Sequence, residues 1–453
     1  MQLQSPSPDS SYETTIDPAA IAMRVVGLAR AGRFAEIEAL FAPPLRAVVS
    51  AETLRIGWET EIGKSGPVSS IGAPVTQPVK AGLIRVSVPV TCERGALSMV
   101  MSVDDIGMLQ GLRIAPAAAT SWTPPSYANP KRFEEHDITV GSGSLAVPGT
   151  LSLPRGRGRW PGVVLLSGGG PFDRDETSGP NKPLKDLAWG LASQGVAVVR
   201  FDKVTFVHNS QVANAPDFTM AEEYVPHAVA AVHLLQHQPT VDPARVFVLG
   251  HSMGGKVAPR VATAEASVAG LVILAGDAQP MQHAAIRVAR YLAALQPSPA
   301  TEAALAVLTR QAALVESSDL SLATPASKLP FGLSGAYWLD LRSYDPVTTA
   351  AALNKPMLIL QGGRDYQVTV EDDLSRWRTG LGRRPDVTIR VYEADNHLFF
   401  SGTGPSTPAD YEPAQHVDPS VVTDIANWLK PHREKGKLAR FVSGLAGLKR
   451  HKH

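Results

Sequence analysis

Residues 246–264 read VFVLGHSMGGKVAPRVATA, and this stretch decides the fold. Residues 246–249 are all apolar and predict a buried strand, whereas residues 254–264 predict a helix. The segment GHSMG between them has the form G-x-S-x-G, whose small end residues let the strand and helix backbones pass closely. Ser252 is therefore predicted on a tight strand-to-helix turn, with its hydroxyl exposed above the sheet. The N-terminus of the helix behind it favours a developing negative charge.

Short apolar strands alternate with helices on both sides of this turn. The other predicted strands are residues 163–166, 196–201, 271–274, 357–360 and 387–392, and the other predicted helices are residues 183–192, 221–237, 371–379 and 419–429. Alternation with all-apolar strands predicts an α/β fold, in which helices cover both faces of a mostly parallel sheet. Residues 278–345 interrupt the alternation with an Ala-rich segment that is helical early, which predicts a helical lid insertion.

An exposed serine on such a turn acts as a nucleophile when a nearby base takes its proton. In folds with this turn the chain order is serine, acid and histidine, and the histidine lies just after the last strand. The chain has 12 histidines, and His397 has this position because it follows the predicted strand 387–392. The sequence therefore predicts Ser252 as the nucleophile and His397 as the base.

The acid that orients this histidine should follow the preceding strand. Asp365 follows the predicted strand 357–360 after a Gly-Gly turn, and it would hold the imidazole in the correct tautomer. Asp277 is the alternative acid, because it follows the strand before that one and some hydrolases take their acid from there. Asp395, two residues before His397, is expected to be structural.

An attacked carbonyl oxygen needs two backbone N–H groups to stabilise its charge. Met253, directly after the serine, is predicted to supply one N–H. Gly169 is predicted to supply the other, from the loop SGGGP that follows the strand 163–166. A glycine-rich loop can instead bind phosphate, but this one lacks the Lys-Ser/Thr ending of a P-loop and the G-x-G-x-x-G spacing. The charged residues 173–176, DRDE, are either a self-paired surface turn or a support for this loop.

Residues 17–118 predict a separate, small α+β unit. Three helices are expected, at 17–32, at 33–42 and after Ser50, where Leu54, Trp58 and Ile62 repeat at intervals of four. The period then changes to two around residues 83–90, which predicts antiparallel strands in a cone-shaped domain. Residues 119–130 are rich in Ala and Pro and predict a linker. Residues 431–453 are a basic tail that is expected to be frayed and solvated, with a surface-binding role as the alternative.

Composition limits the kinds of partner. The chain has 453 residues, 44% hydrophobic and 19% charged, with a net charge of +1, so nothing favours nucleic acid or an anionic membrane. The start lacks a basic segment followed by an apolar one, and no apolar run approaches the roughly 20 residues of a membrane helix. Cys92 is the only cysteine, which together with these features predicts a cytoplasmic protein. No H-E-x-x-H motif or cysteine pair indicates a metal, and no cofactor is expected.

Several longer segments resemble a bacterial group of α/β hydrolases related to dienelactone hydrolases, acyl-thioester hydrolases and S9/S33-type serine peptidases. These segments are SGGGPFDRDE (167–176), GHSMGG (250–255), YWLDLRSYDP (337–346), LILQGGRDYQVT (358–369) and NHLFFSGTGPSTPADYEPAQHV (396–417). The resemblance covers residues 131–430 and implies the α/β-hydrolase fold, with the same three residues as nucleophile, acid and base. Residues 17–118 resemble a nuclear-transport-factor-2-like domain. Many hydrolases have His-Gly in the oxyanion loop, where this chain has Ser167-Gly168.

The predicted function is that of a serine hydrolase, which cleaves a small carboxylic ester or thioester through an acyl-enzyme. An acyltransferase or cyclase would use the same site with an acceptor other than water. A serine peptidase, and a non-catalytic binding protein on a hydrolase scaffold, are the remaining alternatives. A homodimer is compatible with the sequence, which identifies neither the acyl group nor the leaving group.

Overall fold

The computed structural model describes residues 17–46, 49–80, 82–116, 122–212, 215 and 217–430. The chain forms two compact units, Met1–Ser121 and Trp122–His453. The predicted basic tail lies outside the described residues, as do residues 119–121 of the predicted linker.

The first unit begins with helices α1 (Pro18–Arg30), α2 (Phe34–Glu38), α3 (Pro43–Arg46) and α4 (Ala51–Ser65). The side chain of Asp17 caps α1 by accepting a hydrogen bond from the backbone of Ala19, and Ser50 caps α4. Helix α2 is shorter than predicted. Between α2 and α3, the backbone of Phe41 instead forms a bridge with Leu109.

The sheet of the first unit is antiparallel. Its strands are β1 (Val68–Ile71), β2 (Val75–Lys80), β3 (Leu83–Cys92), β4 (Ala96–Asp104) and β5 (Leu109–Pro116), in the order β1-β3-β4-β5 with β2 also paired to β3. Val86, Val88 and Val90 are fully buried against the helices, as their period of two predicts. The similarity of this unit to a nuclear-transport-factor-2-like domain stays a prediction.

The second unit contains one large sheet. Its strands are β6 (Phe133–Val140), β7 (Val147–Pro154), β8 (Trp160–Leu166), β9 (Ala197–Phe201), β10 (Val241–His251), β11 (Leu271–Leu274), β12 (Met357–Gly362) and β13 (Val387–Tyr392). Their order is β13-β12-β11-β10-β8-β9-β7-β6, and all neighbours from β13 to β9 are parallel. The antiparallel strands β6 and β7 were not predicted. Most of β6 is exposed, so it has no apolar run that would reveal it.

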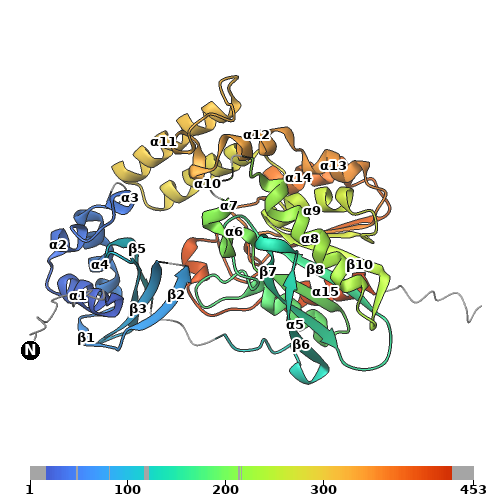
Figure 1. Ribbon diagram of the computed structural model, residues 1–453. Coiled ribbons are helices and arrows are strands. Elements are labelled where there is room, and N and C mark those ends of the chain that lie inside the picture. Colours follow the sequence, from blue (N-terminus) through green and yellow to red (C-terminus); the bar gives the residue numbers. More distant parts are fainter. Residues whose placement is uncertain are drawn as a thin grey trace, which may run out of the picture. The chain divides into compact units, whose positions relative to one another are not determined.

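Helices cover both faces of this sheet (Figure 1). Helices α5 (Pro183–Ser193) and α15 (Pro419–Leu429) share a core with Val163 and Leu165. Helices α8 (Met220–Gln236), α9 (Met253–Ala264) and α14 (Ser375–Leu381), which follows a π-turn at Val370–Leu374, share the opposite core with Val164 and Leu166. Alternate residues of the same strand thus face opposite helical layers, which is the predicted α/β architecture.

The predicted insertion is helical. Helices α10 (Met281–Leu295), α11 (Pro299–Glu316) and α12 (Gly335–Ser343) lie between β11 and α13 (Pro346–Ala352), and they are the yellow and orange ribbons of Figure 1. Two short helices, α6 (Val204–Val207) and α7 (Asn209–Val212), follow β9. These added helices thus follow strands β9 and β11 of the large sheet.

Candidate active site

Ser252 occupies a strained turn between β10 and α9. Its φ of 54° and ψ of −121° lie in a region that residues other than glycine rarely adopt. The backbone N–H of Ser252 donates to the carbonyl oxygen of Leu274, at 2.9 Å. The turn therefore projects the serine from the end of a buried strand, as the G-x-S-x-G pattern predicts.

The two glycines of the motif are required by close backbone contacts. A methyl group at Gly250 would lie 2.1 Å from the carbonyl oxygen of Gly254, and one at Gly254 would lie 2.5 Å from the carbonyl oxygen of Leu166. Neither position has room for a side chain. The strand and the helix can therefore approach closely enough to form the turn only with glycine at both ends.

Asp365 and His397 are brought together at the ends of β12 and β13. The Nδ1 atom of His397 lies 2.7 Å from Oδ2 of Asp365, and both residues are buried. The other carboxylate oxygen of Asp365 accepts hydrogen bonds from the backbone N–H groups of Gln367 and Val368. With Nδ1–H donating to the carboxylate, Nε2 of the neutral ring is left as a proton acceptor. The arrangement is that of an oriented general base.

Asp277 has a different partner. Its Oδ2 lies 2.9 Å from Nζ of the buried Lys256, in helix α9. No hydrogen bond joins Asp277 to His397 in the described part of the chain. Of the two acids weighed from sequence, the structure pairs Asp365 with the histidine.

Ser252 and His397 are linked through the residue before the serine. The ring of His251 lies 4.7 Å from the ring of His397, and its Nε2 lies 2.9 Å from the His397 carbonyl oxygen. Among the described residues, the Ser252 hydroxyl itself has no hydrogen-bond partner. Hydrogen bonds between a nucleophile and its base are often long in the unliganded state and shorten when substrate binds.

His251 and Glu176 form a buried pair that sequence analysis did not single out. Nδ1 of His251 lies 2.9 Å from Oε1 of Glu176. Burial disfavours the charged imidazole, but the Glu176 carboxylate outweighs it and raises the pKa of His251. Since both ring nitrogens face oxygen acceptors, the doubly protonated ring satisfies both. The only sequence signal is that His251 lies inside the motif.

The loop at residues 167–171, from which an oxyanion donor is predicted and which is called the oxyanion loop below, lies beside the serine. A methyl group at Gly168 would lie 3.2 Å from Cβ of Ser252, and one at Gly169 would lie 3.3 Å from Cε of Met253. The N–H of Gly168 is already occupied, because it donates to Oε1 of Glu176 at 2.7 Å. The N–H groups of Gly169 and Met253 have no acceptor within the described segments. They are free to donate to a substrate.

Of the two roles that the sequence left open for the DRDE segment, a self-paired surface turn is wrong, because its charges pair with residues outside the segment and Asp175 and Glu176 are buried. Arg174 pairs with Asp202 at 2.9 Å and Asp175 pairs with Arg200 at 2.8 Å, so these charges neutralise one another. Glu176 instead supports the oxyanion loop through its bond to Gly168. Glu176 adopts a positive φ of 54°, which turns its side chain toward that loop.

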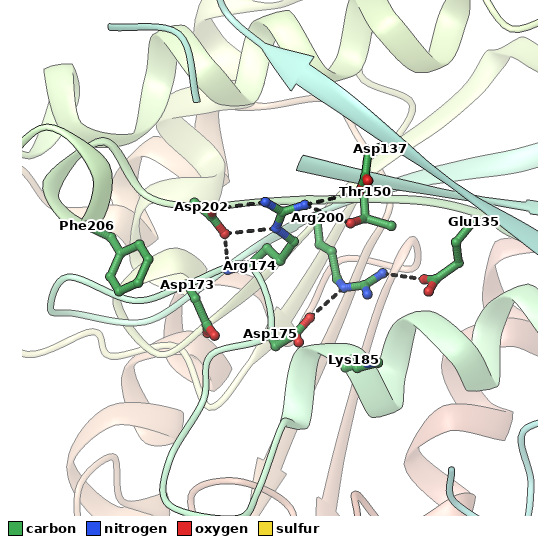
Figure 2. A pocket seen from close by; sticks show the side chains of 10 residues that line it. All are labelled: Glu135, Asp137, Thr150, Asp173, Arg174, Asp175, Lys185, Arg200, Asp202 and Phe206. Carbon is green, nitrogen blue, oxygen red and sulfur yellow. Dashed lines mark hydrogen bonds and ion pairs between the residues drawn. The ribbon is translucent and has the colours of Figure 1, made fainter. Parts of the chain in front are cut away.

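A polar pocket of about 560 Å³ lies beside these ion pairs, and Figure 2 shows the side chains that line it. It is lined by Glu135, Asp137, Thr150, Asp173, Arg174, Asp175, Lys185, Arg200, Asp202 and Phe206. None of Ser252, Asp365 and His397 lines it. Its charged groups are largely engaged with one another, since Arg200 pairs with both Glu135 and Asp175. The lining of this pocket is therefore mostly charged, whereas an ester-binding pocket is expected to have an apolar lining.

The helical insertion is attached to the loop that carries Asp365. Arg287 of α10 donates to the carbonyl oxygens of Tyr366 and Gln367, at 3.1 and 3.0 Å. Tyr291 stacks on Tyr366, with the ring centroids 4.9 Å apart. The insertion thus borders the candidate site, where a lid would act.

Neither a metal-binding cluster nor a membrane-spanning helix is found among the described residues. They contain no group of three or more His, Cys, Asp or Glu side chains placed to hold a metal ion. They also contain no helix that is both long and apolar enough to cross a membrane.

Comparison with known proteins places this chain in a family. The sequence profile described as "Alpha/beta hydrolase family" matches residues 163–414. The chain therefore belongs to the alpha/beta hydrolase family, which confirms the predicted fold class and the prediction of a hydrolase enzyme. It is 37% identical over 337 residues to the Esterase EstD of Thermotoga maritima, covering 74% of this chain and 77% of that protein.

Solved structures give more distant similarities. An esterase of Pyrococcus furiosus is 18% identical with a TM-score of 0.42, covering 69% of this chain and 98% of that one. A hyperthermophilic esterase of Pyrobaculum calidifontis is 18% identical with a TM-score of 0.41, covering 66% of this chain and 85% of that one.

Proposed function

We propose that this protein hydrolyses small carboxylic esters, or the chemically related thioesters, through a triad of Ser252, Asp365 and His397. The observation that carries the proposal is the 2.7 Å contact between Asp365 and His397, which leaves Nε2 of the ring as a base. The strained turn at Ser252 and the esterase name of the relative from Thermotoga maritima support it further.

The reaction begins when Oγ of Ser252 attacks the carbonyl carbon of the ester and Nε2 of His397 takes the hydroxyl proton. The N–H groups of Gly169 and Met253 donate to the oxygen that becomes negative. The tetrahedral intermediate then collapses, and His397 returns the proton to the leaving alcohol or thiol. An acyl group remains on Ser252.

The second half of the reaction repeats these steps with water. His397 takes a proton from water, whose oxygen attacks the acyl carbon, and the same two N–H groups stabilise the second oxyanion. Collapse releases the carboxylic acid and restores the Ser252 hydroxyl. The buried Asp365 stabilises the imidazolium in both halves without itself becoming protonated.

Ser252→Ala tests this proposal. We expect turnover of p-nitrophenyl acetate to fall by about 10⁴-fold or more, because no other group supplies the nucleophile. Covalent labelling by a fluorophosphonate should disappear in the same variant. The exposed Ser343→Ala is the matched control and should label and turn over like the wild type.

Turnover or labelling that persists in Ser252→Ala would refute the assignment of the nucleophile. Wild-type labelling at Ser252 without ester turnover would refute hydrolysis, and it would support an acyl acceptor other than water.

A further inference from the structure

A lysine is buried beneath the oxyanion loop. Lys203, directly before α6, has a side chain only 4% exposed. Its Nζ lies 3.0 Å from the carbonyl oxygen of Gly168 and 2.8 Å from Oε1 of the equally buried Glu223. Burial lowers the pKa of Lys203, and the pairing with Glu223 opposes this shift by stabilising the ammonium. The protonated lysine donates both to the loop and to Glu223.

The same carbonyl oxygen has a second buried donor. The hydroxyl of Tyr224, in α8, donates to the oxygen of Gly168 at 2.7 Å and accepts a hydrogen bond from Lys203. A carbonyl oxygen has two lone pairs, so Lys203 and Tyr224 together saturate it. No lone pair of this oxygen is left to accept a hydrogen bond from water.

The carbonyl of Gly168 and the N–H of Gly169 belong to one peptide group. Because this group is planar and trans, its C=O and N–H point in opposite directions. Fixing the oxygen on Lys203 and Tyr224 therefore also fixes the direction of the Gly169 N–H, which is the candidate oxyanion donor. Hydrogen bonds to the oxygen also polarise the peptide group and strengthen the N–H as a donor.

The network continues into the helical insertion. The hydroxyl of Tyr337, in α12, donates to Oε2 of Glu223 at 2.5 Å and lies 3.7 Å from the sulfur of Met253. Tyr337 is 4% exposed. The insertion therefore contacts both the carboxylate that pairs with Lys203 and the residue that carries the second oxyanion donor.

We propose that Lys203 and Tyr224 are positioning residues that hold and polarise the Gly168–Gly169 peptide, so that the Gly169 N–H is ready for the substrate oxyanion. This proposal rests on the ester-hydrolase function proposed above. Neither the buried lysine nor the buried tyrosine touches the substrate, yet both contribute to stabilising the transition state.

Tyr224→Phe tests the proposal with little disturbance, since it removes one hydroxyl and no charge. Lys203→Met alone would leave the buried Glu223 carboxylate without its counter-charge, so the second variant is the double substitution Lys203→Met/Glu223→Gln. Tyr344→Phe is the matched control, because the Tyr344 hydroxyl also donates to a backbone oxygen, that of Lys256, away from the oxyanion loop.

The measurement compares two ligands that differ in whether they form an oxyanion. A short alkyl trifluoromethyl ketone is attacked by Oγ of Ser252. A carbon–oxygen bond forms, the carbonyl π-bond breaks, and the proton moves to His397. The corresponding secondary alcohol binds without any of these steps. We expect Tyr224→Phe to weaken the ketone about tenfold and the double variant about 100-fold, because a direct oxyanion donor is worth about 10²–10³-fold.

The value of kcat/KM for p-nitrophenyl acetate, per fluorophosphonate-labelled site, should fall by the same factors. Affinity for the alcohol should stay within about twofold. If both ligands and kcat/KM are unchanged while only the melting temperature falls, Lys203 and Tyr224 are packing residues and the proposal is wrong. If the wild type neither hydrolyses the ester nor binds the ketone covalently, the proposed function itself has failed.

Discussion

Asp365 and Asp277 follow neighbouring parallel strands, β12 and β11, at the same edge of the sheet. Both side chains are nearly inaccessible, with relative exposures of 5% and 8%. Yet Asp365 contacts His397, and Asp277 contacts the ammonium group of Lys256. Two carboxylates with similar positions and burial thus have different partners. Asp277 pairs with an ammonium group, whereas Asp365 contacts an imidazole that can act as a base.

The turn after β12 explains why Asp365 contacts His397. A methyl group at Gly362 would lie 2.5 Å from the carbonyl oxygen of Asn396, and one at Gly363 would lie 2.7 Å from Cα of Glu393. The Gly-Gly turn therefore lets the loop that carries His397 pack directly against the Asp365 turn. Asp277 instead contacts Lys256 of helix α9. A strand end places a carboxylate at the sheet edge, but the neighbouring backbone decides its partner.

The largest expected effect comes from Asp365→Asn. The amide cannot stabilise the imidazolium and favours the wrong tautomer of His397, so kcat should fall by about 10⁴-fold. Turnover of p-nitrophenyl acetate, measured with circular dichroism to confirm folding, checks this. If Asp365→Asn stays active while Asp277→Asn is inactive, the roles of the two acids must be exchanged.

Asp277→Asn should instead act on stability. The substitution leaves the buried Lys256 ammonium without its counter-charge, which should lower the free energy of unfolding by about 3–5 kcal/mol. Urea unfolding measures this loss. The value of kcat per labelled site should stay within about tenfold of the wild type.

The matched control combines Asp277→Asn with Lys256→Met. Removing both charges should recover much of the lost stability, because no buried charge is then left unpaired. A double variant that is less stable than the single one would contradict this account of the pair.

The sequence predicted the contact between Asp365 and His397, because strand order and chain order together bring these strand ends to one place. It could not predict the Glu176–His251 pair or the Lys203–Gly168 contact. Their partners are 75 and 35 residues apart, and no periodicity or motif spacing connects them. Charged residues are usually exposed, so the sequence does not indicate that Glu176, His251 and Lys203 are buried.

The smallest effect concerns Asp395, a third buried carboxylate beside the site. Ser401 donates to its Oδ1 at 2.6 Å, while its Oδ2 has no partner among the described residues. Burial raises the pKa of Asp395 to about 6. A raised pKa means that the folded state binds the proton more tightly than the unfolded chain, in which the pKa is about 3.9. The resulting stabilisation is present below about pH 4 and is lost as the pH rises through about 6.

Asp395→Asn imitates the protonated acid at every pH and should remove this dependence. The melting temperature of the variant should match the wild type near pH 4 and exceed it by several degrees at pH 8, because the difference between a pKa of about 3.9 and one of about 6 corresponds to about 3 kcal/mol. Thermal unfolding followed by circular dichroism at both pH values measures the difference. A variant less stable than the wild type at pH 8 would show that the Asp395 charge is needed there, since the ionised side chain would then stabilise the fold.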